Sequence, residues 1–287
     1  MIPWKRIGVA LKSGQSGVEP LLRRIVADVS EHGLELILER EVARVLDSDS
    51  DSDLEQVAAR ADLLIVLGGD GSMLAAARAI GEREVAILGI NVGRLGFLAD
   101  VSPDEVEAAL AAVLGGDYRI RERSRLEVTC LKQGCEPQVD LVLNDAVITK
   151  GTALARLIEL EVLIDQNVVA SYRSDGLIIA TPTGSTAYNL SAGGPLVDPR
   201  LRAMIINPIC PHTLTQRPLV LPDSVQVEVR LLPREEATLT LDGQVGMSLQ
   251  PGDAVRVTRS ARPVRFVTVP GHDLFETLRK KLGWGSR

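Results

Sequence analysis

One carboxylate, Asp70, lies inside a glycine-rich stretch that follows a short apolar run. Residues 67–72 read Leu-Gly-Gly-Asp-Gly-Ser. Gly68, Gly69 and Gly71 let the main chain approach a ligand closely and adopt positive φ, so that amide groups at a helix start can converge on a phosphate. Ser72 completes this loop. A carboxylate is unfavourable in a site that only binds phosphate, so Asp70 indicates work on a proton or a metal ion, or else a structural role in shaping the turn or capping the helix.

Polar residues also interrupt two apolar stretches in the second half of the chain. Asn144 and Asp145 stand between Leu-Val-Leu and Ala-Val-Ile, which would put two short acceptors on opposite faces of a strand or bulge. A plain turn is the alternative. Arg173 and Asp175 flank the start of the apolar run 176–180, where they could bind a ligand or simply form an ion pair.

Two further polar stretches follow. Residues 181–188 read Thr-Pro-Thr-Gly-Ser-Thr-Ala-Tyr, which supplies hydroxyls and amides near a helix start. These groups suit a ribose or a phosphate, and the ring of Tyr188 could pack on a base. An ordinary capped helix is the alternative. The second stretch, Asp242-Gly-Gln244, follows a predicted strand.

Residues 1–120 alternate between strand and helix patterns. The predicted strands are 7–11, 34–39, 63–67 and 85–91. One predicted helix runs toward His32 from a capping box of Ser16 and Glu19, and another runs to Arg60 from a cap of Ser52 and Glu55; further helices are predicted at 73–80 and 103–115. This alternation predicts a three-layer α/β domain with a parallel sheet. Ligands bind beyond the carboxyl ends of such strands, and the loop 68–72 occupies that position.

Beyond residue 120 the apolar pattern changes to a period of two. The predicted strands are 125–131, 141–149, 157–164, 168–173, 176–180, 225–231, 238–241, 254–258 and 264–269. Residues 121–270 are therefore expected to form a second, β-rich and sandwich-like domain, with one helix at 183–190. The amphipathic segment 272–282, within the tail 271–287, predicts a C-terminal helix that could pack back on the first domain.

The composition narrows the class of protein. A net charge of −6 disfavours nonspecific binding to nucleic acid. Three cysteines without a C-x-x-C pair argue against a disulfide framework and a zinc site. The longest apolar runs are too short to span a membrane, and the first residues lack a secretory pattern, so a cytoplasmic protein is expected. The acidic stretch 47–53 is expected to be a solvated loop.

Several of these motifs together resemble the NAD kinase family of the bacterial type. They are the loop 68–72, the segment 91–100, Asn144-Asp145, the long stretch 174–195, and two shorter ones at 211–214 and 280–284. The loop alone is shared with lipid kinases and phosphofructokinases, whereas the long stretch is specific. Two positions depart from the common family pattern. Ser72 replaces a threonine and Asp145 replaces a glutamate, and each substitution keeps the functional group.

The resemblance implies phosphorylation of the 2′-hydroxyl of the adenosine ribose of NAD by ATP, with a divalent metal ion. It makes Asp70 the general base and the loop Gly68, Gly69, Gly71 and Ser72 the ATP phosphate site. The NAD-binding residues that it implies are Asp70, Gly71, Asn144, Asp145, Arg156, Arg173, Asp175, Thr186, Ala187, Tyr188, Asn189, Leu190, Ser191 and Gln244.

The metal is expected to be Mg²⁺ held by phosphates and water, because no dense carboxylate cage or Walker-type lysine loop is present in the sequence. The resemblance also implies a homo-oligomer, a dimer or tetramer, in which β domains associate and Asp175 lies nearest the interface. Two alternatives stay open at this point. One is a soluble lipid or sugar kinase that shares the glycine-rich loop, and the other is a sensor that binds NAD without turnover.

Overall fold

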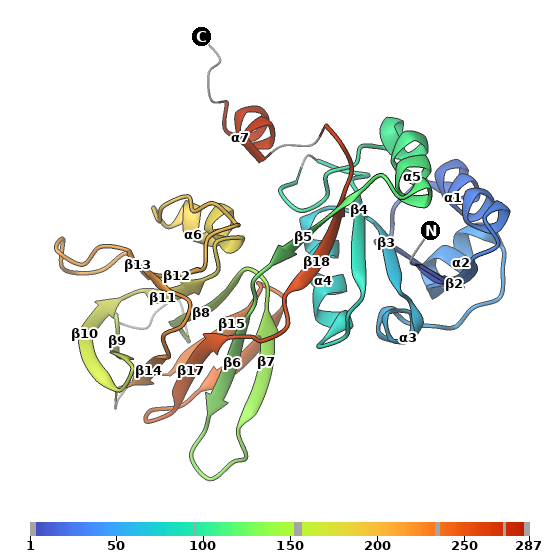
Figure 1. Cartoon of the computed structure of the whole chain (residues 1–287). Coiled ribbons are helices and arrows are strands. Elements are labelled where there is room, and N and C mark those ends of the chain that lie inside the picture. Colours follow the sequence, from blue (N-terminus) through green and yellow to red (C-terminus); the bar gives the residue numbers. More distant parts are fainter. Residues whose placement is uncertain (1–3, 95, 152–156, 233–235, 272–273, 284–287) are drawn as a thin grey trace. The chain divides into compact units, whose positions relative to one another are not determined.

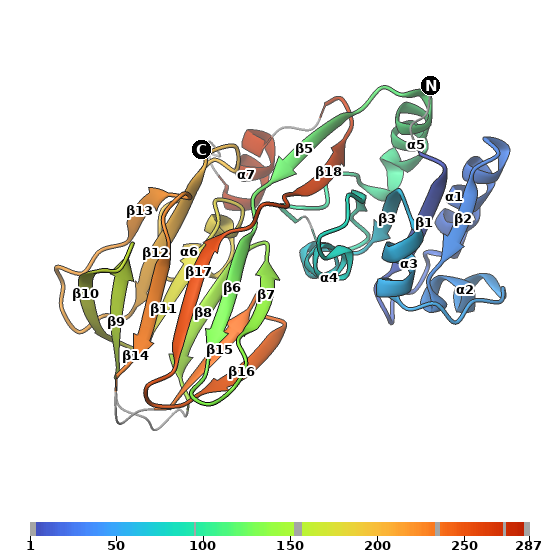
Figure 2. The ribbon, with the colours of Figure 1, turned by 60° about the horizontal axis from the view of Figure 1, so that its bottom comes forward.

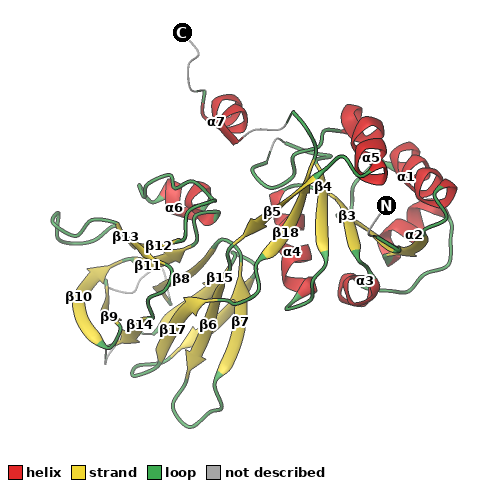
Figure 3. Cartoon of the chain, in the orientation of Figure 1, coloured by secondary structure: helices red, strands yellow, loops and turns green. Residues whose placement is uncertain are grey.

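The computed structural model describes residues 4–94, 96–151, 157–232, 236–271 and 274–283 (Figure 1). The chain divides into two compact units, one formed by Met1–Glu122 with Val264–Arg287 and the other by Arg123–Pro263. The first is an α/β unit and the second is built of antiparallel strands, which confirms the predicted fold class (Figure 3). Among the described residues, no helix combines the length and apolar composition needed to cross a membrane.

The first unit contains a six-stranded sheet in the order β2-β1-β3-β4-β18-β5. Its strands are β1 (Arg6–Leu11), β2 (Glu35–Leu38), β3 (Leu63–Leu67), β4 (Ala86–Ile90), β5 (Arg119–Arg123) and β18 (Val264–Thr268). Neighbouring strands from β2 through β18 pair in parallel. Every residue of β3 and β4 is buried, as expected for central strands that are covered on both faces.

Helices cover both faces of this sheet, so the unit has three layers (Figure 1). They are α1 (Glu19–Glu31), α2 (Arg40–Leu46), α3 (Leu54–Arg60), α4 (Asp70–Ile80) and α5 (Val106–Gly115), with a 3₁₀ turn at Pro103–Glu105. Helix α7 (Leu274–Leu282) is the last element of this unit. Residues of α1, α2 and α5 share one core with alternate strand residues. On the other face, a Cβ at Gly8 would lie 2.7 Å from Val57 of α3, so only glycine permits this close packing.

Three expectations for this unit need correction. The strand Val264–Thr268 was expected in the β domain that ended at residue 270, but it pairs in parallel with β4. All of its residues except Arg265 are buried, and a short apolar strand of this kind fits either sheet, so periodicity could not assign it. Helix α3 is capped by Asp53, with a reciprocal bond from Gln56, and not by Ser52 and Glu55. Helix α2 was not expected at all.

The parallel arrangement brings distant parts of the chain to one edge of the sheet. Because β1, β3, β4 and β18 run in the same direction, the segments that follow them begin at the same edge. These segments start at Lys12, at Gly68, at Asn91 and at Val269. The loop with Asp70 therefore has neighbours from the start, middle and end of the chain.

The second unit consists of two six-stranded antiparallel sheets, in the orders β10-β9-β14-β17-β6-β7 and β13-β12-β11-β8-β15-β16 (Figure 2). The strands are β6 (Leu126–Leu131), β7 (Gln138–Val142), β8 (Asp145–Lys150), β9 (Ile158–Ile164), β10 (Asn167–Ser174), β11 (Gly176–Ala180), β12 (Ala203–Ile209), β13 (Leu219–Pro222), β14 (Val227–Leu231), β15 (Ala237–Leu241), β16 (Val245–Leu249) and β17 (Ala254–Arg259).

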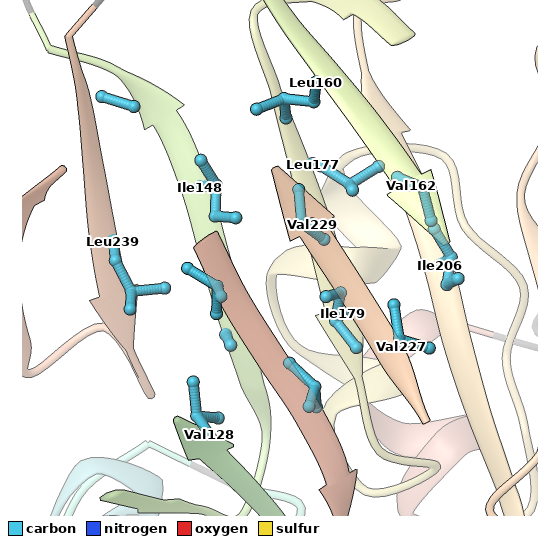
Figure 4. Close-up of a cluster of buried hydrophobic side chains, with 14 of the residues drawn as sticks. Val128, Ile148, Leu160, Val162, Leu177, Ile179, Ile206, Val227, Val229 and Leu239 are labelled. Atoms are coloured by element: carbon cyan, nitrogen blue, oxygen red, sulfur yellow. The ribbon is translucent and has the colours of Figure 1, made fainter. Parts of the chain in front are cut away.

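Branched aliphatic side chains from both sheets fill the space between them (Figure 4). Ile148, Leu177 and Ile206 of one sheet meet Leu160 and Val229 of the other. The β-branched residues favour strands, and their burial supplies the main driving force for the sandwich. Strand β12 was not expected, because Asn207 and Pro208 interrupt its apolar run; both are buried within it.

The expected single strand 141–149 is two strands in different sheets. Strand β7 ends at Val142 in one sheet, and β8 begins at Asp145 in the other. The chain therefore changes sheets at Leu143 and Asn144. At such a crossing neither sheet can accept all the main-chain N–H groups, so other acceptors are needed.

Candidate active site

The glycine-rich loop joins β3 to α4 at the carboxyl edge of the parallel sheet. A Cβ at Gly68 would collide with the side chain of Ser72, so glycine is required for the tight return of the chain. Gly69 occupies the N-cap position of α4, and no side chain caps this helix start. Free amide groups at a helix start attract anions. The strand, loop and helix start follow one another as expected, but none of the three glycines has the positive φ that was also expected. Phosphate binding by the loop stays a prediction.

The carboxylate of Asp70 does not cap the helix. It accepts N–H groups from the segment that follows β4: the amide of Phe97 lies 2.9 Å from both oxygens, and the amide of Leu98 lies 2.9 Å from Oδ1. The capping interpretation of Asp70 is therefore wrong. These bonds fix the orientation of the carboxylate, and the side chain remains about one-third exposed (32%). Asp70 is thus a held but accessible acceptor.

The segment 91–100 is shaped to hold that carboxylate. Asn91 accepts the amide of Gly93 at 3.0 Å and donates to the carbonyl of Arg94 at 3.1 Å. Gly96 is buried against Asp70, and a Cβ at this position would lie 2.7 Å from the carboxyl carbon. The glycine in this motif therefore makes room for the carboxylate.

A pocket of about 370 Å³ opens beside the loop. Its lining includes Gly69, Gly71 and Ser72 of the loop, together with Lys12 and Glu39. Burial raises the pKa of Glu39, although its carboxylate accepts the amide of Leu11 at 2.9 Å. Lys12 follows β1 and places a cation beside the amides of the helix start. Neither Lys12 nor the pocket was recognised in the sequence.

Helix α7 adds a second cation next to Asp70. The Nζ atom of Lys281 lies 3.7 Å from Oδ2 of Asp70 and 4.2 Å from the centre of the Phe97 ring. The contact between Lys281 and Asp70 could not be predicted from the sequence, because the apolar periodicity of residues 272–282 indicates only an amphipathic helix.

In the second unit, Asp242 organises the crossing between the two sheets. Its carboxylate accepts the amides of Leu143 at 2.9 Å, Asn144 at 2.7 Å and Asp145 at 3.1 Å. These are the N–H groups that neither sheet can satisfy. Asp242 was noted as part of a polar stretch, and its role in fixing Asn144 and Asp145 is a finding of the structure.

Asp145 is itself nearly inaccessible, with 4% of its surface exposed. Burial, with a smaller contribution from the charge of Asp242, raises its pKa from 3.8 to about 7. A carboxylate kept in a low-dielectric site is costly unless a ligand or partner compensates it. A hydroxyl of a bound ligand could provide that compensation.

A pocket of about 310 Å³ lies at this crossing. Of the predicted nucleotide-binding residues, the structure gathers four here: Asn144, Asp145, Ala187 and Tyr188. Thr240, Asp242 and Gly243 also line it. Tyr188 is 44% exposed, so its ring is accessible for stacking on a base. The pocket thus combines hydrogen-bond acceptors with an aromatic surface.

The stretch 181–191 does not form the single helix that was expected at 183–190. It packs on the outer face of one sheet. It contains a 3₁₀ turn at Gly184–Thr186 and a four-residue helix, α6 (Tyr188–Ser191). The hydroxyl of Thr181 donates to the carbonyl of Leu143 at 2.6 Å and accepts the amide of Gly184 at 3.0 Å. These bonds fasten the stretch to the sheet crossing, which explains how Tyr188 reaches the pocket.

Asn189 is fully buried and its amide group is used within the protein. It donates to the carbonyls of Ser185 at 3.2 Å and Pro195 at 3.0 Å, and it accepts from Asn207 at 3.1 Å. Its side chain therefore positions the stretch. Thr186 and Leu190 are partly buried and Ser191 is exposed. Contacts of these residues with a ligand stay predictions.

The other predicted nucleotide contacts lie outside the lining of this pocket. Arg173 lies 3.7 Å from the carboxylate of Glu159, and Asp175 pairs with Lys150 at 2.8 Å. The ion-pair alternative thus fits both residues in the isolated chain, although Arg173 pairs with Glu159 and not with Asp175. Gln244 is exposed in the turn between β15 and β16. Arg156 lies outside the described residues.

The side chains around Asp70 determine whether a metal ion could bind there. Within the described ranges, no three His, Cys, Asp or Glu side chains gather as a metal-binding cluster. Asp70 accepts main-chain N–H groups and faces Lys281, so it offers a cation little free ligand capacity. Mg²⁺ held by the phosphates of a nucleotide stays a prediction from the sequence.

We expect Asp145→Asn to stabilise the ligand-free protein at alkaline pH. Between pH 4 and 7 only the folded state holds the Asp145 proton, so the free energy of unfolding falls as the pH rises, and the full cost is present above pH 7. A rise of the pKa from 3.8 to about 7 corresponds to about 4 kcal/mol at most. Asn should recover about 1–3 kcal/mol at pH 8.5 and much less at pH 5.5.

Urea unfolding of both proteins at the two pH values measures this difference. Glu136→Gln removes the same charge at an exposed position of the same unit and serves as the control. An Asp145→Asn variant that is less stable than the parent protein at pH 8.5 would contradict the burial cost assigned to Asp145.

The fold and these residues define a class of protein before any comparison is made. A phosphate-type loop with a held carboxylate on an α/β unit, and a polar pocket with an aromatic wall on a β-sandwich, are the parts of a nucleotide-dependent phosphotransferase. Comparisons with known proteins narrow this class.

The family model of the ATP-NAD kinase N-terminal domain matches residues 18–118. The family model of the ATP-NAD kinase C-terminal domain matches residues 143–269. The chain is 43% identical over 285 residues to the NAD kinase of Syntrophotalea carbinolica, covering 99% of this chain and all of the relative. It is 45% identical over 284 residues to that of Geobacter metallireducens, again over 99% of this chain and the whole relative. The chain belongs to the NAD kinase family.

Two solved structures agree with this assignment. Yeast NADH kinase complexed with NADH aligns with a TM-score of 0.90 and 26% identity, covering 99% of this chain and 89% of the yeast chain. An NAD kinase from Archaeoglobus fulgidus in complex with ATP aligns with a TM-score of 0.75 and 27% identity, over 97% of both chains. The predicted family resemblance is thus confirmed, and the alternatives of a lipid or sugar kinase and of a sensor are not favoured.

Proposed function

We propose that this chain transfers the γ-phosphoryl group of ATP to the 2′-hydroxyl of the adenosine ribose of NAD, giving NADP and ADP. In this reaction the 2′-oxygen forms a bond to the γ-phosphorus, and the bond from that phosphorus to the bridging oxygen of ADP breaks. The proton of the hydroxyl passes to the carboxylate of Asp70, which acts as general base.

The main support for this proposal is that the carboxylate of Asp70 is held in place and yet remains accessible. It stands at the start of α4 without capping it, it is oriented by the amides of Phe97 and Leu98, and part of its surface stays open. A purely structural carboxylate would have no need of that accessible surface. Its position beside the amides of the loop places a proton acceptor next to a phosphate site.

For ATP, we assign the pocket beside the glycine-rich loop. Gly69, Gly71 and Ser72 would contact the phosphates, and Lys12 would neutralise part of their charge. Gly68 shapes the loop. Mg²⁺ bound to the phosphates would supply further neutralisation. The complex of the archaeal relative with ATP supports a nucleoside triphosphate as the phosphoryl donor.

For NAD, we assign the pocket at the sheet crossing. Asn144 and Asp145 would bind ribose hydroxyls, and Tyr188 would stack on a base. The remaining predicted contacts follow from the family resemblance: Gly71, Arg156, Arg173, Asp175, Thr186, Ala187, Asn189, Leu190, Ser191 and Gln244. The NADH complex of the yeast relative supports a dinucleotide acceptor. A cytoplasmic location and the lack of a nucleic-acid partner stay predictions from the sequence.

A substrate panel tests the acceptor. The purified protein with ATP and Mg²⁺ is offered NAD, diacylglycerol or fructose 6-phosphate, and ADP formation is measured. We expect ADP formation to depend on NAD alone. Turnover of either other acceptor in place of NAD would favour the alternative kinases, and NAD binding by calorimetry without ADP formation would favour a sensor.

We also propose that the β-rich units associate into a homo-oligomer. Apolar side chains at one edge of the sandwich are exposed, with Val168 at 57%, Val169 at 49% and Val220 at 46%. The strands that carry them, β10 and β13, are edge strands of the two sheets. Asp175 directly follows β10, which agrees with its predicted place near an interface.

Light scattering is expected to give a multiple of the 30.9 kDa chain mass. Combining Val168→Glu with Val220→Glu should shift the protein toward the monomer, because the charges would be buried in the interface. Val139→Glu is the matched control, since Val139 is 55% exposed on β7, at the opposite edge of the same sheet as β10. An active monomeric parent protein would exclude the proposed assembly.

A further inference from the structure

Lys281 is the one of three consecutive basic residues in α7 that turns toward the catalytic carboxylate. Its side chain is 26% exposed, and Nζ lies 3.7 Å from Oδ2 of Asp70. Its neighbour Lys280 is 63% exposed and pairs within the helix with Glu276 at 2.8 Å. The Nζ atom of Lys281 also lies over the ring of Phe97, 4.2 Å from the ring centre. The two lysines are thus adjacent in sequence but differ in surroundings.

Asp70 does not need Lys281 to satisfy its oxygens. Both oxygens already accept main-chain N–H groups at 2.9 Å. At 3.7 Å the ammonium group is beyond hydrogen-bond distance, and a partly exposed ion pair of this kind adds little stability. In the part of the chain that the structure describes, no hydrogen bond from Nζ is found. The donors of this ammonium group are therefore available to a ligand.

A cation that stayed at Asp70 would also obstruct the proposed reaction. The 2′-hydroxyl must approach the same carboxylate to give up its proton, so Lys281 and the substrate compete for this acceptor. A triphosphate carries more negative charge than one carboxylate and offers more oxygens. When ATP is bound, the ammonium group gains by moving from Asp70 to the phosphates.

The glycine-rich loop itself lacks a lysine. In loops of the Walker type a lysine reaches the β- and γ-phosphates, and the charge on the transferred group must be stabilised in any phosphoryl transfer. Lys12 lies in the pocket beside the loop, whereas Lys281 lies at the carboxylate that takes the proton. Because the γ-phosphoryl group must meet the hydroxyl that Asp70 deprotonates, its place in the proposed reaction is beside Asp70 and hence beside Lys281.

We propose that Lys281 binds the γ-phosphoryl group of ATP and is held on Asp70 only while the site lacks ATP. The inference rests on the proposed function, because it takes ATP as the phosphoryl donor and Asp70 as the base. Helix α7 then completes the phosphate site, and departure of Lys281 from Asp70 frees the carboxylate for the hydroxyl. In this role Lys281 contacts the group that is transferred, and it is therefore a catalytic residue.

Calorimetric binding of ATP and of ADP, each with Mg²⁺ and without NAD, tests this role in the absence of turnover. We expect Lys281→Met to weaken ATP binding on the order of tenfold to a hundredfold, as for loss of a hydrogen bond to a charged group, and ADP binding less than about twofold. Lys281→Arg should keep most of the ATP affinity. Lys280→Met is the matched control and should bind both nucleotides like the parent protein.

The comparison of ATP with ADP separates a phosphate contact from a structural effect, because a displaced helix would not discriminate between them. Equal weakening of both nucleotides, or unchanged ATP binding by Lys281→Met, would overturn the proposal. A parent protein that binds no ATP would instead refute the proposed function and this inference with it. Thermal melting of each variant confirms that the protein is folded.

Discussion

Asp70→Asn is expected to lower turnover by about 10² to 10⁴, the usual cost of removing a general base, while NAD binding stays nearly unchanged. Asn keeps the shape of the side chain, and its carbonyl oxygen can still accept the amides of Phe97 and Leu98 where Oδ1 does now. What it loses is the ability to take up the proton of the hydroxyl. Steady-state kinetics with calorimetric binding of NAD measure both effects.

The alternatives for Asp70 predict other results. If the carboxylate only orders the segment that follows β4, Asn should retain most of the activity, because two of the three contacts persist. Loss of activity that is restored by raising the Mg²⁺ concentration would assign Asp70 to metal binding. Near-parental turnover by Asp70→Asn would refute the general-base role.

Gly96→Ala is expected to reduce turnover by at least about 10²-fold, although glycine has no side chain that could take part in the reaction. A methyl group here would lie within van der Waals overlap of the Asp70 carboxylate, 2.7 Å from its carboxyl carbon and 3.1 Å from Oδ2. The side chain would be pushed from its position at the loop. Because catalysis depends on placement within a fraction of an ångström, turnover should fall far more than NAD affinity.

Gly93→Ala is the matched control in the same segment. Its Cβ would meet only Oδ1 of Asn91, at 3.9 Å, which is an ordinary contact. This variant should keep nearly all activity and melt like the parent protein. If Gly96→Ala is as active as Gly93→Ala, the carboxylate has no strict positional requirement, and the assigned role of the segment 91–100 fails.

Local patterns in the sequence were enough for the parts of the site that are contiguous. The apolar run 63–67, three glycines and an amphipathic helix identify the strand, loop and helix at Asp70, since each depends on neighbours in the chain. The polar interruption at Asn144 and Asp145 likewise indicated a break in the apolar pattern, as a bulge or a turn would produce. Its cause, a change of sheet whose amides are accepted by Asp242, depends on a residue far along the chain.

The rest of the site depends on pairing that the sequence does not encode locally. Strand β18 is a short, mostly apolar strand whose sequence would fit either sheet, yet it lies in the parallel sheet beside β4. That pairing brings helix α7 into the first unit and Lys281 to Asp70. The closeness of Gly96 to Asp70 is equally invisible, because glycine also serves in ordinary turns.

The central claim is tested most directly by incubating the purified protein with ATP, Mg²⁺ and NAD and identifying the products. The account predicts equal amounts of ADP and NADP, with the new phosphate on the 2′-oxygen of the adenosine ribose as located by phosphorus NMR. A heat-killed sample gives the background. No NADP above that background, over a range of pH and of divalent metal ions, would contradict the assignment.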